Sequence, residues 1–278
     1  MRATLEIFDL ATGRAQVLLD TDRHIEAPNW APDGSHLLVN AAGRLFRVDL
    51  ADPALVDVDT GKHGQLNNDH GISPDGQWVA LSDKTETGDK SCIYVMPASG
   101  GTPRRVTDKV PSWYHGWTPD GGSITYTCVR DGRFGIATLT LDTLTETVVT
   151  TADAHFDGPD YTPDGAWIWF NSDQGGSSDL WRIRPDGTDA QQMTHATRVE
   201  WFPHPSPDGR HVLYLSYPPG TENHPFGLSV ELRLMPAEGG PARVLLPLFG
   251  GQGTLNVPCW APDSSRFAFV RYYQDDQE

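Results

Sequence analysis

The stretch "PHPSPDGRHVLYLSY", from Pro203 to Tyr217, joins a Ser-Pro-Asp-Gly phrase to a run of alternating apolar residues. The phrase or a close variant occurs six times, with its proline at positions 32, 74, 119, 163, 207 and 262. Intervals of 42 to 55 residues match the length of one four-stranded blade of a β-propeller. The repeat predicts an all-β, single domain over residues 1–278, a six-bladed β-propeller of four-stranded antiparallel blades.

The phrase itself is typical of a hairpin turn. Proline presets the backbone of the second turn position, aspartate hydrogen-bonds nearby amides, and glycine takes a conformation that larger residues avoid. We therefore interpret the phrase as scaffold rather than chemistry. Four aromatic residues precede the proline by two positions, and packing between blades explains them best: Trp30, Trp117, Tyr161 and Trp260.

The two ends of the chain are expected to share one blade. After "RFAFVRYY" the last repeat has only its first two strands, which begin after Asn256, and "ATLEIFDLATGRAQVLL" near the N-terminus reads like the missing third and fourth strands. Closure of this kind removes open sheet edges, which otherwise favour aggregation.

Charge and composition argue against two classes of partner, nucleic acids and membranes. The net charge of −16 and the lack of a Lys/Arg cluster make a nucleic-acid partner a poor expectation. No apolar run approaches the about eighteen residues of a membrane span, and "MRATLEIFDL" is strand-like rather than a signal core, so we expect a cytoplasmic protein without a membrane partner. The three cysteines, Cys92, Cys128 and Cys259, lack paired spacing and are expected to be reduced.

The recurring "(S/T/A)PDG", followed by an apolar strand, a strand like "DLWRIRPDG" and an ending like "QQMT", resembles the repeat of the TolB-like β-propeller family along nearly the whole chain. The resemblance implies strands ordered outward from the channel, with the turn joining the first two. Family members include periplasmic interaction proteins, propeller lids of peptidases and propellers like the seven-bladed oligogalacturonate lyases. The repeat therefore indicates the fold and says little about function.

Residues that the scaffold does not require gather at the face opposite the turns, around the channel mouth. Six residues before the turn proline stand Glu26, Asn68, Trp113, Asp157, Trp201 and Asn256. Nearer the proline stand His70, His115, Asp160 and His204. The ends of the second strands add Asn40, Lys84, Arg130, Asn171, Tyr217 and Arg271. Two expanded loops, "YPPGTENHPFGLS" and "LPLFGGQGTLNVP", the latter with Gln252, are expected on the same face, because insertions on one face of a repeat array often mark its binding face.

Several interpretations of these residues remain open. His70, His115 and His204 come from three blades and are either one site or ordinary rim residues, and Glu26, Asn68, Asp157 and Asn256 either bind a ligand or cap strand ends. Oxygen donors would suit calcium or manganese, whereas His70, His115 and His204 with Asp157 would suit zinc or manganese. A site without metal is the alternative.

The leading functional hypothesis is the binding, with processing, of a small polar ligand, most plausibly a sugar or sugar acid. Trp113 and Trp201 would stack on a sugar ring, while Lys84, Arg130 or Arg271 would hold a carboxylate. In a lyase or hydrolase, His70, His115 or His204 would act as base, Tyr217 as acid and Arg130 or a metal as electrophile. The remaining polar residues, among them Asn171, Gln252 and Asn256, would bind hydroxyl groups. The rival hypothesis is a protein-interaction scaffold resembling TolB, whose channel mouth receives a partner's peptide.

Overall fold

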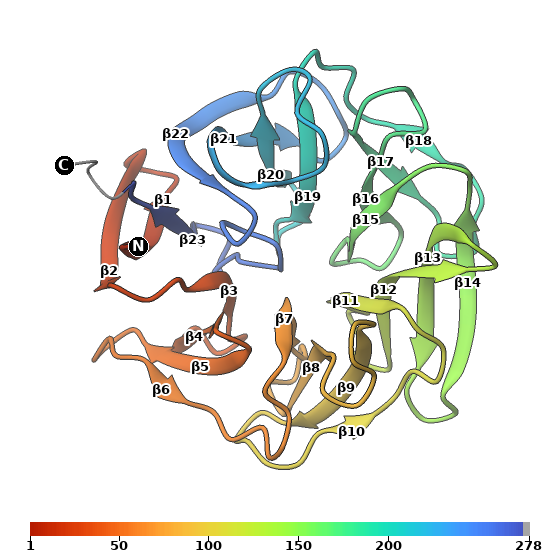
Figure 1. The fold of residues 1–278 in the computed structure, drawn as a ribbon. Coiled ribbons are helices and arrows are strands. Elements are labelled where there is room, and N and C mark those ends of the chain that lie inside the picture. The colour runs from red at the N-terminus through yellow and green to blue at the C-terminus, as the bar shows by residue number, and fades with distance from the viewer. Residues whose placement is uncertain (275–278) are drawn as a thin grey trace.

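In the computed structural model the chain forms a ring of six β-sheets, and residues 1–274 are described (Figure 1). The first blade after the N-terminal strands is β3 (Glu26–Trp30), β4 (His36–Ala41), β5 (Arg44–Asp49) and β6 (Val56–Asp57). The next is β7 (Leu66–Ile72), β8 (Trp78–Asp83), β9 (Cys92–Pro97) and β10 (Arg104–Arg105). The third is β11 (Ser112–Trp117), β12 (Ser123–Arg130), β13 (Arg133–Thr140) and β14 (Thr145–Thr151).

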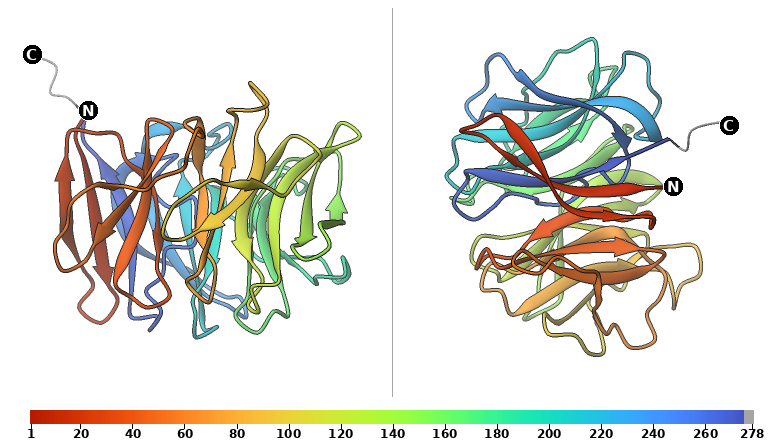
Figure 2. Two further views of the ribbon diagram at one scale, coloured as in Figure 1. Left: turned by 90° about the horizontal axis from the view of Figure 1, so that it is seen from below. Right: turned by 90° about the vertical axis from the view of Figure 1, so that its left-hand side faces the viewer.

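Two more blades follow the same order of strands. One is β15 (Phe156–Tyr161), β16 (Ile168–Ser172), β17 (Asp179–Ile183) and β18 (Gln191–Gln192). The other is β19 (Val199–Pro205), β20 (His211–Tyr217), β21 (Phe226–Pro236) and β22 (Arg243–Gly251). Each first strand lies innermost and pairs antiparallel with the second, so the six-bladed fold is confirmed (Figures 1 and 2).

The proline phrase is the hairpin turn that joins the first two strands. In the fifth blade, Gly209 has a φ of 70° and donates its N–H to the Ser206 carbonyl at 2.8 Å. The Asp208 carboxylate accepts hydrogen bonds from the Ser206 hydroxyl at 2.6 Å and from the Arg210 amide at 3.0 Å. Glycine is favoured because the left-handed conformation costs it no Cβ clash. Proline, aspartate and glycine thus fix the tight turn between the first two strands in five blades, and in the sixth Ser264 takes the glycine position with a φ of 61°.

The ends of the chain complete the sixth blade. β1 (Ala3–Asp9) pairs antiparallel with β23 (Arg266–Tyr272) from Ala3 opposite Tyr272 to Asp9 opposite Arg266, and β2 (Arg14–Thr21) lies outside β1. The innermost position is held by the bridge between Trp260 and Phe267. Closure by the N-terminal strands is therefore confirmed.

Apolar side chains fill the spaces between neighbouring blades. In β20, the six residues from Val212 to Tyr217 are all buried, because both faces of this strand pack against other sheets. Phe8 of β1 stacks on Phe267 of β23 with ring centroids 5.1 Å apart. The three cysteines are buried and unbridged. No helix within residues 1–274 is long and apolar enough to cross a membrane.

Candidate functional site

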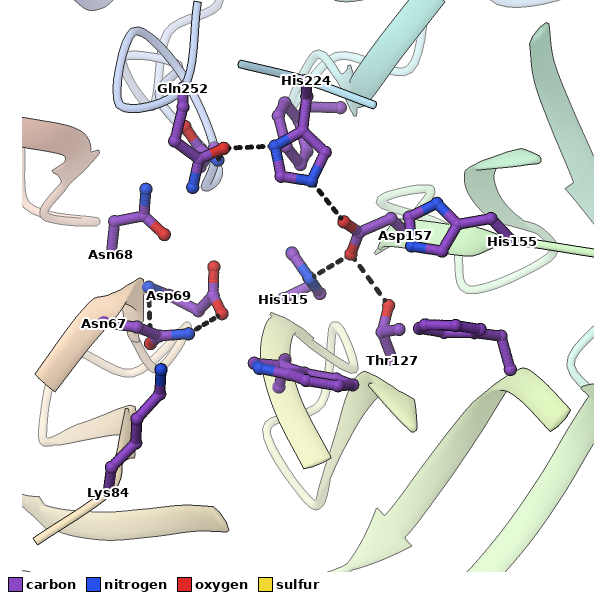
Figure 3. Close-up of a pocket in the computed structure, with 14 residues that line it drawn as sticks. Asn67, Asn68, Asp69, Lys84, His115, Thr127, His155, Asp157, His224 and Gln252 are labelled. Atoms are coloured by element: carbon purple, nitrogen blue, oxygen red, sulfur yellow. Dashed lines mark hydrogen bonds and ion pairs between the residues drawn. The ribbon is translucent and has the colours of Figure 1, made fainter. Parts of the chain in front are cut away.

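A polar pocket of about 350 Å³ opens at the channel mouth, on the face opposite the proline turns. The inner strands β7, β11 and β15 supply its floor and walls, and the two expanded loops close one side (Figure 3). We call it the mouth pocket. It is lined by Asn67, Asn68, Asp69, Lys84, Trp113, His115, Thr127, Phe134, His155, Asp157, Phe202, His224, Gln252 and Asn256.

Asp157 is the electrostatic centre of the mouth pocket. Its Oδ1 lies 2.8 Å from Nε2 of His115 and accepts hydrogen bonds from the Thr127 hydroxyl at 3.1 Å and the Gly158 amide at 2.9 Å, while Oδ2 lies 3.4 Å from Nε2 of His224. Burial opposes the charge, but the charge and hydrogen bond of His115, with those of His224, hold the pKa of Asp157 well below its ordinary value. Asp157 is therefore an ionised carboxylate that contacts one imidazole through each of its two oxygens.

The carboxylates of the mouth pocket raise the pKa of both imidazoles. Burial lowers the pKa of each, but Asp157 and Asp69 outweigh it, so the pKa of both His115 and His224 lies above 6.5. His224 also hydrogen-bonds Oε1 of Gln252 through Nδ1 and contacts the ring of Trp201 at 4.4 Å between centroids. These contacts fix the imidazole although it belongs to a loop between β20 and β21.

Asp69 has the opposite character from Asp157. It is 6% exposed on β7, and its carboxylate accepts a hydrogen bond from the Asn67 amide. Burial raises its pKa to about 6, with the charge of Asp157 adding to the effect and that of His115 opposing it. A carboxyl group with a pKa near the working pH exchanges protons readily, so Asp69 is suited to acid–base chemistry.

A third cation and a set of amides complete the polar side. Lys84, at the end of β8, lies beside Asn67 and Asp69 in Figure 3, and within residues 1–274 its ammonium group makes no ion pair. Asn256 donates to Gln252 Oε1 at 3.0 Å. The amides offer hydrogen-bond donors and acceptors, and the ammonium group of Lys84 is available to pair with a ligand anion.

The other wall is aromatic. Trp113 is half-buried and stacks on Phe134 with centroids 6.3 Å apart, and Phe134 contacts the edge of His155 at 4.5 Å. Phe202 lies beneath the pocket and contacts His224 at 5.2 Å. An apolar wall facing a polar one is what a ligand with one flat apolar face and several polar groups requires.

Of the predicted site residues, seven line the mouth pocket: Asn68, Lys84, Trp113, His115, Asp157, Gln252 and Asn256. Glu26 lies just behind, where it accepts a hydrogen bond from Asn68 at 3.4 Å. Trp201 and Asn171 are buried behind the lining: Trp201 packs on His224, and Asn171 Oδ1 accepts the Phe202 amide at 3.1 Å.

The prediction that three histidines share one site needs correction. His70 is fully buried, its ring nitrogens make no hydrogen bond of normal geometry within the described residues, and burial outweighs weak contacts with the backbone of Leu38 and Asn68 and lowers its pKa to about 4. His204 is buried lower in the channel, where Nδ1 lies 3.2 Å from Asp160 and Nε2 donates to the Leu255 carbonyl at 2.9 Å. Only His115 reaches the mouth pocket.

The predicted acid and electrophiles are also engaged elsewhere. Tyr217 is buried and donates its hydroxyl to the Pro225 carbonyl at 3.2 Å. Arg130 is paired with Glu146 at 2.6 Å, and Arg271 is paired with Glu6 at 2.7 Å. Neither arginine lines the mouth pocket, and each is engaged by its own carboxylate partner. A ligand carboxylate would meet Lys84 instead.

A metal site does not form from the predicted ligands. In the part of the chain that the structure describes, no three His, Cys, Asp or Glu side chains lie close enough together to hold an ion. His115 and Asp157 pair with each other, and the orphaned nitrogens of His70 face no second ligand. Within residues 1–274, the three histidines and Asp157 therefore do not gather into a cage for zinc or manganese.

Several lining residues escape the sequence reasoning: Asn67, Asp69, Thr127, Phe134, His155, Phe202 and His224. Asp69 is adjacent to Asn68 and His70, and His224 belongs to the expanded loop "YPPGTENHPFGLS", so both stand in stretches that the repeat marks as unusual. A histidine inside an insertion on the predicted binding face is the signal that would have found His224.

Comparison with known proteins places the chain in a family. The PD40 family, described as the TolB beta propeller domain, matches residues 115–231. "Uncharacterized protein Atu1656" of Agrobacterium fabrum is 48% identical over 274 residues, which cover 98% of this chain and 93% of that protein. The chain belongs to the TolB-like β-propeller family.

Solved structures agree with this placement. A TolB candidate from Agrobacterium tumefaciens superposes with a TM-score of 0.97 at 48% identity over 99% of both chains. The Tol-Pal system protein TolB of Francisella tularensis (strain WY96-3418) is 28% identical over 211 residues, 72% of this TolB-like chain but 47% of the relative, so the chain spans about half the length of that protein. An oligogalacturonate lyase in complex with manganese has a TM-score of 0.60 at 17% identity, covering 89% of this chain and 74% of the other, and shows the fold alone.

Proposed function

We propose that this TolB-like propeller binds a small polar molecule that carries a carboxylate, most plausibly a sugar acid, in the mouth pocket and processes it by acid–base chemistry. The observation that carries the proposal is the pairing of Asp69, whose pKa is about 6, with a cationic side made by His115, His224 and Lys84. A proton-exchanging group beside a positive pole is what removal of a proton next to a carboxylate requires.

Each wall has a part in holding such a ligand. The indole of Trp113 offers a flat platform for a sugar ring. The Lys84 ammonium pairs with the ligand's carboxylate, and the amides of Asn68 and Gln252 hydrogen-bond its hydroxyl groups. Because the protein uses Lys84 for no ion pair of its own within residues 1–274, the ligand's carboxylate supplies the missing partner.

The chemistry then follows from the two carboxyl groups. Asp69, ionised, takes the proton from the carbon next to the ligand's carboxylate, and the electron pair left on that carbon is stabilised by Lys84 and the two imidazoles. The bond from the neighbouring carbon to its oxygen substituent breaks, a double bond forms, and the protonated Asp69 returns the proton to the departing oxygen. Asp157, whose pKa is well below its ordinary value, stays ionised and favours the protonated forms of His115 and His224, whose pKa it raises.

A second candidate function is a protein-interaction scaffold, which is favoured by the relatives named as Tol-Pal system protein TolB. In this case a peptide rather than a sugar acid occupies the mouth pocket, and its acidic group pairs with Lys84. The cytoplasmic location stays a prediction, and cell fractionation tests it.

A thermal-shift screen of uronic-acid oligosaccharides, neutral glycosides and acidic peptides tests the proposal, because a ligand that binds only the folded state raises the unfolding temperature. We expect uronic-acid compounds alone to shift the parent. Lys84→Ala should weaken the best compound about ten-fold or more, since a charge-assisted contact is lost. Asp69→Asn should retain binding and lose turnover.

Lys90→Ala is the matched control, because Lys90 is exposed in the same blade and does not line the pocket. Equal weakening by both lysine variants would overturn the assignment of Lys84. If acidic peptides raise the unfolding temperature and sugar acids do not, the protein-interaction scaffold becomes the favoured function.

A further inference from the structure

The face of the turns carries a second pocket, independent of the function proposed above. It has a volume of about 300 Å³ and is bordered by the turn prolines Pro32, Pro74, Pro163, Pro207 and Pro262. The inner strands run between the two pockets: β11 places Trp113 and His115 in the mouth pocket and Trp117, at its other end, in the second. We call the second one the turn-face pocket.

A circle of six side chains, four of them aromatic, surrounds the turn-face pocket. Each blade contributes the side chain two residues before its turn proline: Trp30, Ile72, Trp117, Tyr161, Pro205 and Trp260. The three indoles are packed between blades, as their register predicts, yet each still lines the pocket. Aromatic faces attract organic cations through the ring quadrupole, and a circle of them is the usual host for an ammonium group.

The floor of the turn-face pocket is polar. Asp160 is the one charged residue among the described residues that line it, and it is 8% exposed. Its Oδ2 faces His204 at 3.2 Å, and no side chain within residues 1–274 donates to Oδ1. Tyr114 also lines the pocket, is 1% exposed, and has no hydrogen-bond partner for its hydroxyl within the same residues. The Asp160 carboxylate, which also accepts a hydrogen bond from the Tyr161 backbone, and the Tyr114 hydroxyl thus line the pocket with acceptor positions open to a further donor.

Two glycines make room for this floor. A Cβ on Gly71 would lie 2.4 Å from the Tyr114 hydroxyl oxygen, and a Cβ on Gly116 would lie 3.1 Å from Oδ1 of Asp160. Both glycines stand three residues before a turn proline, at the register where the next two blades carry Asp160 and His204. Any other residue at Gly71 would displace the Tyr114 hydroxyl.

The rim of the same face is acidic because of the repeat itself. Each turn places one exposed aspartate directly after the proline: Asp33, Asp75, Asp120, Asp164, Asp208 and Asp263. Hydrogen bonds within each turn lower the pKa of these carboxyl groups and outweigh the burial that acts most on Asp208. Six ionised carboxylates therefore surround the opening, and a ring of one sign attracts the opposite charge.

We propose that the turn-face pocket binds a small organic cation, an ammonium group on an apolar or aromatic body, with the ammonium on Asp160 and the Tyr114 hydroxyl and the body within the ring of aromatic side chains. Charge complementarity selects the cation: one carboxylate on the floor, six around the rim, and aromatic faces between them. A neutral molecule of the same shape gains only the apolar contacts.

Isothermal titration with benzylammonium and its neutral counterpart benzyl alcohol, at about pH 8 where the carboxyl groups are ionised, tests the proposal. We expect one benzylammonium per chain and an affinity at least about ten-fold above that of the alcohol. The comparison of two ligands on the unaltered protein needs no variant and so does not depend on any variant's folding.

Asp160→Asn should remove the preference for the cation, whereas Asp69→Asn, in the mouth pocket, should keep it. Equal affinities for the two ligands on the parent would overturn the proposal. Loss of benzylammonium binding in Asp69→Asn with retention in Asp160→Asn would also overturn it, because the cation would then occupy the mouth pocket.

Discussion

Nε2 of His115 lies 2.8 Å from Oδ1 of Asp157, and both side chains are almost completely buried at the mouth of the channel. Because Asp157 also faces His224, one carboxylate sets the charge of two imidazoles from different segments of the chain. The pKa values of these two imidazoles therefore depend mainly on Asp157, with Asp69 adding to the effect.

Replacing Asp157 with Asn should lower the pKa of both His115 and His224 by about one unit or more, since Asp69 would then be the one carboxylate left to oppose the effect of burial. Titration of the imidazole resonances by NMR measures the change. The exposed His195 serves as the internal control. If His115 and His224 titrate as in the parent, Asp157 does not set their charge.

Asp69→Asn should stabilise the fold at high pH and leave it little changed at low pH. The folded-state pKa of Asp69 is raised to about 6, so its ionisation costs stability as the pH rises from its unfolded value through about 6. The gain above that pH is at most about 3 kcal/mol. Denaturant unfolding at about pH 4 and about pH 8 measures it, and an equal effect at both pH values would contradict the expectation.

His70→Leu should make the protein more resistant to acid without changing ligand binding at the mouth pocket. The pKa of His70 is lowered to about 4, so the neutral ring contributes stability above its unfolded pKa, which is lost as the pH falls toward about 4. Leucine has no proton to gain and leaves no orphaned nitrogen, which otherwise costs about 1–3 kcal/mol. Unfolding midpoints between about pH 4 and about pH 7 test this expectation. If the variant loses ligand binding, His70 contributes to the mouth pocket after all.

Deleting residues 1–18 should lower the melting temperature by at least about 10 °C and produce aggregation. The deletion removes β1, whose Leu5 and Phe8 are buried, and exposes the edge of β23. Melting curves and size-exclusion chromatography measure the effect. Val17→Ala, at an exposed position of β2, is the control and should melt like the parent. If the truncated chain also melts like the parent, closure of the ring by the N-terminal strands contributes little to stability.

The fold could be predicted because the same turn is written into the sequence six times. A Pro-Asp-Gly turn fixes where the first strand ends and the second begins, and the interval between turns fixes the number of strands. The closing blade could be predicted because the last repeat has only its first two strands and the N-terminal segment reads like the other two. Neither inference depends on the direction of any single side chain.

The site was predicted only in part, because bulges alter the register of the inner strands. The irregularity lies between Leu66 and His70 in β7 but between Tyr114 and Gly116 in β11. His70 and His115 stand at the same distance from their prolines, yet only His115 faces the pocket, since a slip of one residue reverses a side chain. His224 comes from a loop, where no periodicity fixes its direction.

The pairing of β1 with β23 also determines the order in which the molecule can be assembled. β1 leaves the ribosome long before β23 is made, so it can pair with β2 while its other edge stays open as the other blades form. Contacts between such distant segments fold slowly, and an exposed strand edge is a place where newly made chains associate. The ring can therefore close only after β23 has been made, and a chain stalled before β23 would be a substrate for chaperones or proteases rather than a smaller working propeller.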